Sequence, residues 1–293
     1  MKWMVISSLA LTTLCLGSCN NHVNKNENHS TMADSSSFKS GYSAVNGLKM
    51  YYEIHGDKGN SLVLIHGGGS TIGTSFGKVL PALAKNFTVI AVELQGHGHT
   101  NDRDAPESFE QDADDLVTLL NNLHISKASF LGFSNGGNTA MQIAVRHPGI
   151  VNKLILASAF YKREGLPPGF FDGMKQATLQ DMPEILRNAF LRINPDSSKL
   201  ISMFNKDRER MLNFTDWKDE MLRSIKAPAL IICGDRDVIL PEHTVAMSKL
   251  IPESRLMILP SEHGAYIGAA ESTDAGTNVI ELTAGIITNF LNK

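Results

Sequence analysis

Four polar residues of this chain are of the types that together hydrolyse an acyl bond. Ser134 stands in residues 132–137, which read Gly-Phe-Ser-Asn-Gly-Gly, and Asp235, Asp237 and His263 follow later in the chain. A serine hydroxyl is a weak nucleophile near neutral pH, so it needs a histidine to accept its proton and a carboxylate to orient that histidine. The sequence therefore predicts Ser134 as the nucleophile and His263 as the general base, with one of the two aspartates beside it.

The segments around Ser134 suit that role. Residues 128–131 form an apolar run typical of a buried strand, and residues 138–146 are expected to form a helix. A serine between such a strand and helix sits on a sharp, strained turn, where side chains at Gly132 and Gly136 would collide with neighbouring backbone. The helix N-terminus would also present free N–H groups and a positive dipole end to a developing oxyanion.

The rest of the domain alternates between strand-like and helix-like segments. Apolar strands that alternate with helices indicate a mostly parallel sheet covered by helices on both faces. Strands are expected over residues 42–45, 48–55, 61–65, 88–92, 128–131, 153–157, 229–233 and 255–259. Helices are expected over residues 76–84, 109–123, 138–146, 243–250 and 279–291.

The alternation stops over about residues 160–226, which contain Pro167-Pro168 and several helix-like pieces but no clear strand. Ligands of open α/β sheets bind outside the carboxyl ends of the strands, so a helical insertion after a strand would lie over that crevice as a cap. Methionine and phenylalanine adapt to irregular ligands, and a few of those in the cap are expected to line an apolar pocket. The residues in question are Phe170, Phe171, Met174, Met182, Phe190, Met203, Phe204 and Met211.

The N-terminal segment is typical of a targeting signal. Residues 1–18 combine Lys2 with an apolar stretch that is short for a membrane span, and residues 16–19, Leu-Gly-Ser-Cys, resemble a bacterial lipobox with Cys19 as the acylated residue. The alternatives are an ordinary secretory signal with a chance cysteine and an uncleaved anchor. Residues 19–40, rich in Asn and Ser, are expected to form a flexible tether.

These features place the predicted domain, residues 41–293, on a lipid anchor in the bacterial cell envelope, facing the periplasm. An aspartate directly after the cysteine resembles an inner-membrane retention signal. Asn20 stands there instead, which favours the outer membrane. Besides Cys19, the cysteines are Cys15, within the segment to be removed, and Cys233, which is expected to be a buried thiol. No disulfide is therefore expected.

Charge and residue spacing argue against two other classes of protein. The formal net charge is −3 and no basic cluster stands out, so nothing favours nucleic-acid binding. His66, His97 and His99 have no carboxylate or cysteine around them in a metal-ligand pattern, and no metal is expected.

The motifs together resemble the α/β-hydrolase fold family, of the fold-1 type. They are residues 66–69 (His-Gly-Gly-Gly), 96–99 (Gly-His-Gly-His), 132–137, 234–237 (Gly-Asp-Arg-Asp) and His263. Within the family the chain is most similar to the group that contains meta-cleavage-product hydrolases, valacyclovir-hydrolase-like esterases and proline iminopeptidases. The resemblance implies a mostly parallel eight-stranded sheet with a helical cap insertion. It also implies a serine hydrolase that cleaves a small or medium carboxylic ester without a cofactor.

The resemblance also implies roles for individual residues. The family motif places the acid three residues after the glycine, which here is Asp237, and leaves Asp235 as a turn or capping residue. Two backbone N–H groups would form the oxyanion hole, one from Asn135 and one from Gly68, with Gly69 as the second choice. The histidines at positions 66, 97 and 99 would brace loops near the active site.

Other polar residues of the domain are expected to be surface groups. His243 follows Pro241-Glu242 at a helix start, and Asp112, Asp114 and Asp115 lie on a helix face where they would be solvated. One of these three acids could instead hydrogen-bond to a neighbouring loop.

Three other functions remain open. A hydrolase of carbon–carbon bonds in dienoic acids would use the same triad and would need a cationic clamp, which Lys162, Arg163 or Arg192 could supply. A proline iminopeptidase-like peptidase is disfavoured, because residues 67–70 read Gly-Gly-Gly-Ser without the proline usual in that group. A catalytically silent binding lipoprotein, from a different class of function, would have no need of the intact triad.

Overall fold

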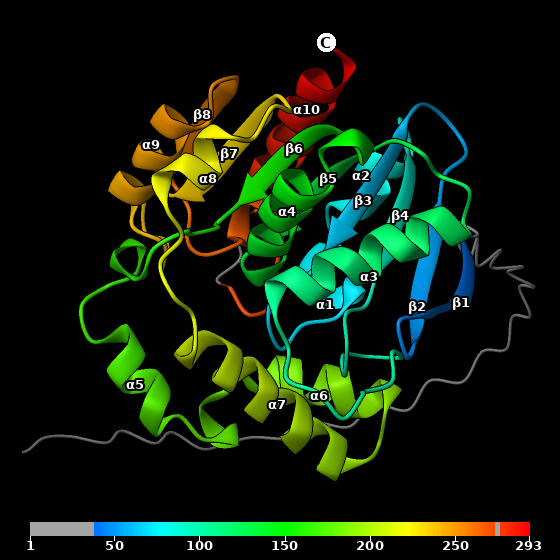
Figure 1. The fold of residues 1–293 in the computed structure, drawn as a ribbon, viewed down its shortest axis with the longest axis vertical. Coiled ribbons are helices and arrows are strands. Elements are labelled where there is room, and N and C mark those ends of the chain that lie inside the picture. The colour runs from blue at the N-terminus through cyan, green and yellow to red at the C-terminus, as the bar shows by residue number, and fades with distance from the viewer. Residues whose placement is uncertain (1–37, 273–275) are drawn as a thin grey trace, which may run out of the picture. The chain divides into compact units, whose positions relative to one another are not determined.

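The computed structural model describes residues 38–272 and 276–293, and its centre is an eight-stranded sheet in the order β1-β2-β4-β3-β5-β6-β7-β8. β1 and β2 are antiparallel to their neighbours, whereas the pairs from β4 to β8 are parallel. Figure 1 shows the sheet with helices on both faces, as predicted. The predicted signal and most of the tether lie outside the described residues.

The strands follow the apolar runs of the sequence closely. Asn46 and Gly47 have φ of 43° and 87°, so a two-residue turn with both central φ values positive joins β1 and β2. The first strand begins at Lys39, inside the range predicted as tether, because Lys39 already pairs with Ile54. The strands are β1 (Lys39–Val45), β2 (Leu48–His55), β3 (Ser61–Ile65), β4 (Thr88–Val92), β5 (Ala128–Phe133), β6 (Val151–Ala157), β7 (Ala229–Gly234) and β8 (Ser254–Leu259).

The helix predicted over residues 76–84 is confirmed over residues 80–84 but is wrong at its start, because residues 77–79 form a turn between two short helices. α1 ends at Phe76 and α2 begins at Leu80. A continuous helix would place Pro81 in its interior, where the ring lacks an N–H and would clash with the carbonyl of Gly77. The helices of the sheet layers are α1 (Ile72–Phe76), α2 (Leu80–Ala84), α3 (Phe109–Asn122), α4 (Asn135–Arg146), α9 (Pro241–Leu250) and α10 (Thr277–Asn292).

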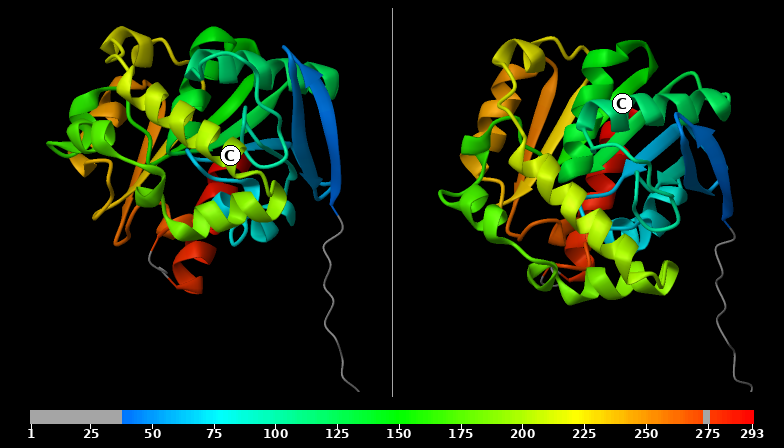
Figure 2. Two further views of the ribbon diagram at one scale, coloured as in Figure 1. Left: turned by 90° about the horizontal axis from the view of Figure 1, so that it is seen from below. Right: turned by 60° about the horizontal axis from the view of Figure 1, so that its bottom comes forward.

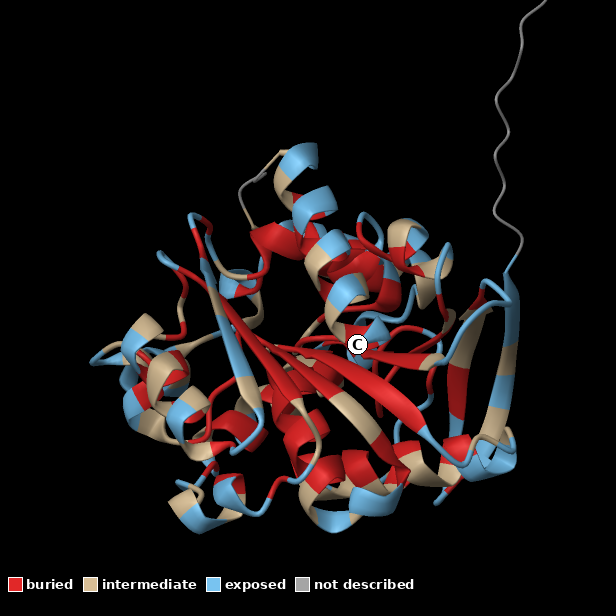
Figure 3. Cartoon of the chain, turned by 90° about the horizontal axis from the view of Figure 1, so that it is seen from above, coloured by how far each residue is buried: buried red, intermediate tan, exposed pale blue. Residues whose placement is uncertain are grey.

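Two apolar cores lie on opposite faces of the sheet. In β3, Val63 and Ile65 pack toward the core that α3 and α4 cover, whereas Leu62 and Leu64 pack toward the core that α1, α2 and α10 cover. Figure 3 shows the central strands as a buried layer between the helices. Burial of both faces explains why these strands read as continuous apolar runs rather than as alternating ones.

Between β6 and β7 the chain forms four α-helices. They are α5 (Phe170–Gln176), α6 (Glu184–Ile193), α7 (Ser197–Leu212) and α8 (Asp219–Arg223). The first three lie across the carboxyl end of the sheet (Figures 1 and 2), and α8 packs back against α4 and α9. We refer to α5, α6 and α7 as the cap helices. None of the helices in the described ranges is long and apolar enough to cross a bilayer.

Candidate active site

Ser134 occupies a strained turn between β5 and α4. Its backbone has φ of 53° and ψ of −122°, a conformation that L-residues rarely adopt. A Cβ on Gly132 would lie 2.1 Å from the carbonyl oxygen of Gly136, and a Cβ on Gly136 would lie 2.2 Å from that of Ile65. Only glycine fits at these two positions, so the local sequence directs Ser134 out of the sheet at its carboxyl edge.

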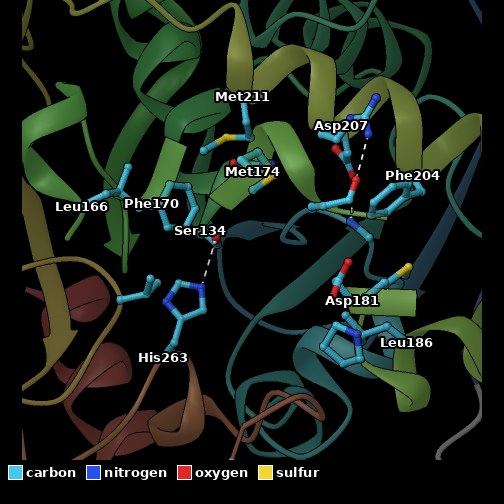
Figure 4. Close-up of a pocket in the computed structure, with 18 of the residues that line it drawn as sticks. Ser134, Leu166, Phe170, Met174, Asp181, Leu186, Phe204, Asp207, Met211 and His263 are labelled. Atoms are coloured by element: carbon cyan, nitrogen blue, oxygen red, sulfur yellow. Dashed lines mark hydrogen bonds between the residues drawn. The ribbon is translucent and has the colours of Figure 1, made fainter. Parts of the chain in front are cut away.

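The structure brings Ser134, His263 and Asp237 into one hydrogen-bonded chain. The Nε2 atom of His263 lies 3.2 Å from the Ser134 Oγ, and its Nδ1 lies 2.6 Å from the Asp237 Oδ1. Figure 4 shows the contact between Ser134 and His263 inside the pocket. If Nδ1 donates to the carboxylate, Nε2 is left with a lone pair that faces the serine hydroxyl. This arrangement allows His263 to accept the hydroxyl proton.

Asp237 is buried and held as a carboxylate. Burial favours its neutral form, but hydrogen bonds from His263, Ser158 and the amide of Ile239 lower the pKa of Asp237 below its usual value. The Ser158 Oγ donates to Oδ2 at 2.5 Å, and the Ile239 N–H donates to Oδ1 at 3.0 Å. The charged form therefore persists at neutral pH and can stabilise a protonated His263.

Asp235 has a different environment from Asp237. Its Oδ1 accepts a hydrogen bond of 2.8 Å from the Ser261 amide, which joins the loop after β7 to the loop after β8. Its side chain thus supports the loop that carries His263, while Asp237 contacts the imidazole itself.

The loop after β3, residues 66–71, borders the pocket beside Ser134 and contains both glycines considered for the oxyanion hole. The Gly69 N–H donates to the Asp207 Oδ2 at 2.6 Å. The N–H groups of Gly68 and Asn135 donate to no acceptor within the part of the chain that the structure describes. A Cβ on Gly68 would lie 2.6 Å from the Asn135 Nδ2, so the two residues are adjacent. Gly68, rather than Gly69, therefore has an amide available to a ligand oxygen.

The histidines at positions 66, 97 and 99 hold loops around this site. The Nδ1 of His66 donates to the Gly67 carbonyl at 2.7 Å, and its Nε2 accepts from the Leu94 amide at 3.0 Å. Burial and the neighbouring His97 lower the pKa of His66 to about 3, so it is neutral. The Nδ1 of His99 lies 2.8 Å from a carboxylate oxygen of Glu93. Among the described residues, no group of three or more potential ligand side chains could hold a metal ion.

A buried charge cluster, formed by His97, Glu107, Asp112, Asp207 and Arg210, joins α7 to the sheet domain. Arg210 contacts the carboxylates of Glu107, Asp112 and Asp207, and the Asp207 Oδ2 lies 3.0 Å from the His97 Nε2. Asp207 and Arg210 are not among the residues predicted from the sequence. They lie on the same face of α7 as the buried Met203 and Met211, and charged residues on the apolar face of an amphipathic helix are a signal that could have found them.

The prediction that the acids of α3 are solvated is wrong for two of them. Asp112 and Asp115 are 2% and 0% exposed, and they pair with Arg210 and Arg103. Burial outweighs the effect of Arg210 and raises the pKa of Asp112 to about 6. Asp114 lies nearer the surface and pairs with Arg146. Partners from distant segments of the chain, which the local pattern does not contain, account for the difference.

The prediction that His243 lies at the surface is also wrong. It is 6% exposed, its ring stacks on that of Tyr161, and its Nε2 accepts a hydrogen bond of 3.2 Å from the Tyr161 amide. Burial lowers the pKa of His243 to about 4. The side chain fits against Gly165, where a Cβ would lie 2.5 Å from the ring. Cys233 is buried, as predicted.

A pocket of about 320 Å³ lies between the cap helices and the carboxyl edge of the sheet, and both Ser134 and His263 line it. Figure 4 shows these two residues on one side and Asp181, Leu186 and Asp207 on the other. The wall is mostly apolar and includes Leu166, Phe170, Met174, Met182, Met203, Phe204 and Met211. Six of the eight cap residues considered from the sequence thus line the pocket, and Phe171 and Phe190 instead pack against other cap side chains.

The cation in the pocket wall is not one of those considered from the sequence. Arg208 lines the pocket and donates through Nη1 to the Ala177 carbonyl at 2.8 Å. Its buried Nε has no hydrogen-bond partner among the described residues. By contrast, Lys162 pairs with Asp219, and Arg163 donates to the carbonyls of Leu212 and Phe214. Arg208 was missed because the direction in which it points depends on how α7 packs.

Comparison with known proteins adds three findings. Residues 60–201 match the family described as "alpha/beta hydrolase fold". The chain is 30% identical over 219 residues to the AB hydrolase superfamily protein YisY of Bacillus subtilis, over 65% of this chain and 80% of that protein. It is 29% identical over 245 residues to the human serine hydrolase BPHL, over 78% of this chain and 81% of that protein.

A solved structure shows the same fold. A meta-cleavage product hydrolase from Pseudomonas fluorescens IP01 superposes with a TM-score of 0.71 over 87% of this chain and 97% of that one, at 22% identity.

Proposed function

The chain belongs to the alpha/beta hydrolase family, and from this premise we propose that it is a serine hydrolase that cleaves a small or medium carboxylic ester. The observation that carries the proposal is the hydrogen-bonded chain of Ser134, His263 and Asp237 at an apolar pocket. The similarity to a protein named as a serine hydrolase supports it.

The proposed reaction proceeds through an acyl-enzyme. The Ser134 Oγ attacks the ester carbonyl carbon while its proton passes to the His263 Nε2, and Asp237 stabilises the imidazolium that forms. The carbonyl oxygen becomes an oxyanion that accepts hydrogen bonds from the N–H groups of Gly68 and Asn135. The C–O bond then breaks, and His263 returns the proton to the departing alcohol. In the second half, water attacks the acyl carbon, His263 takes its proton, and Ser134 leaves with that proton restored.

One observation favours a second candidate, a hydrolase of carbon–carbon bonds in dienoic acids. Such a substrate carries a carboxylate, and Arg208 presents a cation in the pocket wall with its Nε unpaired among the described residues. The hydrogen bond from Nη1 to Ala177 fixes the orientation of the guanidinium. Guanidinium groups bind carboxylates through paired N–H donors. Arg208 could therefore hold the carboxylate of a dienoic acid, or the free carboxylate of an ester made from a dicarboxylic acid. No observation on the described residues favours a peptidase or a silent binding protein.

A panel of p-nitrophenyl esters, assayed beside a dienoic acid that carries the carbon–carbon bond to be cleaved, tests both candidates. The wild type is expected to hydrolyse neutral short and medium acyl esters, and half-esters of dicarboxylic acids are expected to have a lower KM. Arg208→Gln should raise KM for the half-esters by about tenfold or more, the size of a lost charge-assisted hydrogen bond, and should leave neutral esters unaffected. Arg192→Gln is the matched control, because this cap arginine does not line the pocket.

The outcomes of the panel separate the candidates. No hydrolysis of any ester would overturn the proposed function. Equal KM values for neutral and charged esters, in the wild type and in Arg208→Gln, would remove the support for a carboxylate-bearing substrate. Turnover of a dienoic acid much faster than that of every ester would favour the second candidate.

We propose further that Cys19 is acylated and that the enzyme is held at a membrane of the bacterial envelope, facing the periplasm. The support is the lipobox-like sequence of residues 16–19, which lies outside the described residues. A single acyl chain gives marginal membrane binding, whereas two or more give stable anchoring. The fully lipidated wild type should therefore sediment with membranes and incorporate labelled palmitate.

Cys19→Ser supplies the test of this location. The variant should lose palmitate label and change its processing, while ester hydrolysis should persist because the site lies far along the chain. Unlabelled wild type in the soluble fraction would show that the segment is a plain secretory signal.

A further inference from the structure

Asp207 is a residue of a cap helix that reaches the loop beside the proposed nucleophile. It lies on α7, yet its Oδ2 accepts a hydrogen bond of 2.6 Å from the amide of Gly69 in the loop after β3. The same oxygen lies 3.0 Å from the His97 Nε2, and Arg210 contacts the other carboxylate oxygen. One carboxylate thus connects the cap to two loops of the sheet domain.

The contact fixes the peptide that follows Gly68. On the other side of Gly68, the Gly67 N–H donates to the Ser75 Oγ at 3.3 Å and the Gly67 carbonyl accepts from His66. Gly68 is therefore held from both sides, while its own amide stays available. The two Gly67 contacts come from the sheet domain, and the 2.6 Å contact of the Gly69 N–H comes from the cap. The Gly69 nitrogen also lies 3.2 Å from the His97 Nε2, which can accept a hydrogen bond only when His97 is neutral.

The charges around Asp207 keep it an acceptor. Burial opposes ionisation, but Arg210 and His97 hold the pKa of Asp207 well below its usual range. Burial also disfavours a charged His97, yet the neighbouring carboxylate raises the pKa of His97 to about 9. Protonated His97 donates through Nδ1 to the Gln95 carbonyl at 2.8 Å and through Nε2 to Asp207. At neutral pH the Asp207 Oδ2 therefore accepts from both His97 and Gly69.

We propose that Asp207 is a positioning residue, which orients the Gly68 amide through Gly69 and so makes the oxyanion hole depend on the docking of α7. The inference rests on the proposed serine-hydrolase function. In an enzyme built this way, displacement of the cap helix would take the carboxylate acceptor away from the Gly69 N–H and loosen the oxyanion hole, although Ser134, His263 and Asp237 would remain in place. Efficient catalysis would then occur only while the cap covers the bound substrate.

Asp207→Asn tests the proposal, since the amide keeps the size of the side chain but has one acceptor oxygen where the carboxylate has two. The Arg210 guanidinium favours that oxygen on its own side, so an NH₂ group would face the Gly69 N–H and could not accept from it. Loss of one oxyanion-hole donor costs about 10²–10³ in kcat, and a misplaced donor should cost part of that, so we expect kcat to fall by about 10- to 100-fold. KM for a neutral p-nitrophenyl ester should change little. Glu209→Gln is the matched control, because Glu209 is exposed on the same helix and should leave both constants unchanged.

A transition-state analogue distinguishes positioning from a general structural role. A trifluoromethyl ketone forms a hemiketal oxyanion with an active serine, and its Ki should rise by the same factor by which kcat/KM falls. A non-hydrolysable ether of similar shape places no oxyanion in the hole, so its Ki should stay unchanged. A merely structural defect of the pocket would weaken both ligands together.

If Asp207→Asn does not fold, a charge-balanced variant and a measurement on the wild type still test the proposal. The pair Asp207→Asn/Arg210→Gln removes one buried charge of each sign, and thermal unfolding is measured before kinetics. In the wild type, amide NMR should show the Gly68 resonance shifting strongly when the hemiketal forms, while that of Gly69, already bonded to Asp207, shifts little.

Three results would overturn the inference. The first is an unchanged kcat and an unchanged Ki for the ketone in a folded Asp207 variant. The second is a Ki for the ether that rises as much as the Ki for the ketone. The third is a Gly69 resonance that shifts as much as that of Gly68. A failure of the proposed function itself would appear in a different experiment, as ester hydrolysis that persists in Ser134→Ala.

Discussion

Ser134→Ala is expected to lower kcat for a short p-nitrophenyl ester by about 10⁴- to 10⁶-fold, because the proposed reaction would lose its nucleophile. The variant should also lose all labelling by a fluorophosphonate, which reacts with an activated serine. The fold should persist, since the only hydrogen bond of the hydroxyl to the described residues is with His263, and alanine keeps the Cβ of the turn. Stopped-flow or steady-state assays of ester hydrolysis with the purified full chain measure the change in kcat.

Ser129→Ala is the matched control for this experiment. Ser129 is buried on the same strand, β5, but does not line the pocket, so its loss should leave activity and labelling intact. Wild-type activity in folded Ser134→Ala would show that the serine-hydrolase mechanism is wrong.

Asp237→Asn is expected to lower kcat by about 10⁴-fold, because the side-chain amide would favour the wrong tautomer of His263. An Asn amide donor facing Nδ1 would require that nitrogen to accept, so Nε2 would carry the proton and could not take one from Ser134. The Asp237 carboxylate also accepts hydrogen bonds from Ser158 and from the amides of Gly234 and Ile239. Because the substitution changes these contacts too, a thermal melting curve is measured to check that the variant is folded.

Asp235→Asn is the matched control, two residues away on the same loop. It should cost far less, because an asparagine oxygen can still accept the hydrogen bond from the Ser261 amide. A larger loss of activity at position 235 than at position 237 would assign the orienting role to Asp235.

The sheet could be predicted closely because its central strands are buried on both faces. Residues 61–65 and 88–92 were predicted as strands and form β3 and β4 with the same bounds. The start of α4 was predicted three residues late, because Gly136 and Gly137 occupy its first turn and glycine is a poor helix former. These glycines are present because the backbone of Ile65 and the Ala159 side chain lie too close for a Cβ.

The cap side of the site could be predicted only in outline. The composition of the cap indicated an apolar pocket, but which side chains face it depends on how α7 packs against α5 and α6. Arg208 and Asp207 are neighbours in sequence and both line the pocket. The Arg208 Nε has no hydrogen-bond partner in the described part of the chain, whereas Asp207 is held in the buried charge cluster. His243 was misplaced for a similar reason, because Tyr161 and Gly165, which bury it, belong to a distant part of the chain.

The position of the cap insertion between two strands of the sheet affects how the pocket can change in evolution. The cap helices are inserted between β6 and β7, which are adjacent strands paired at Leu154 and Ala229. The entropy of closing a loop grows slowly with its length, and each doubling costs only about 0.6 kcal/mol. Related proteins could therefore lengthen, shorten or rebuild this insertion at little cost in loop-closure entropy. Such changes would alter the pocket wall opposite Ser134, while the turn after β5 and the loops after β7 and β8 would stay unchanged. If Asp207 has the role proposed for it, such divergence has to keep or replace its contact with Gly69.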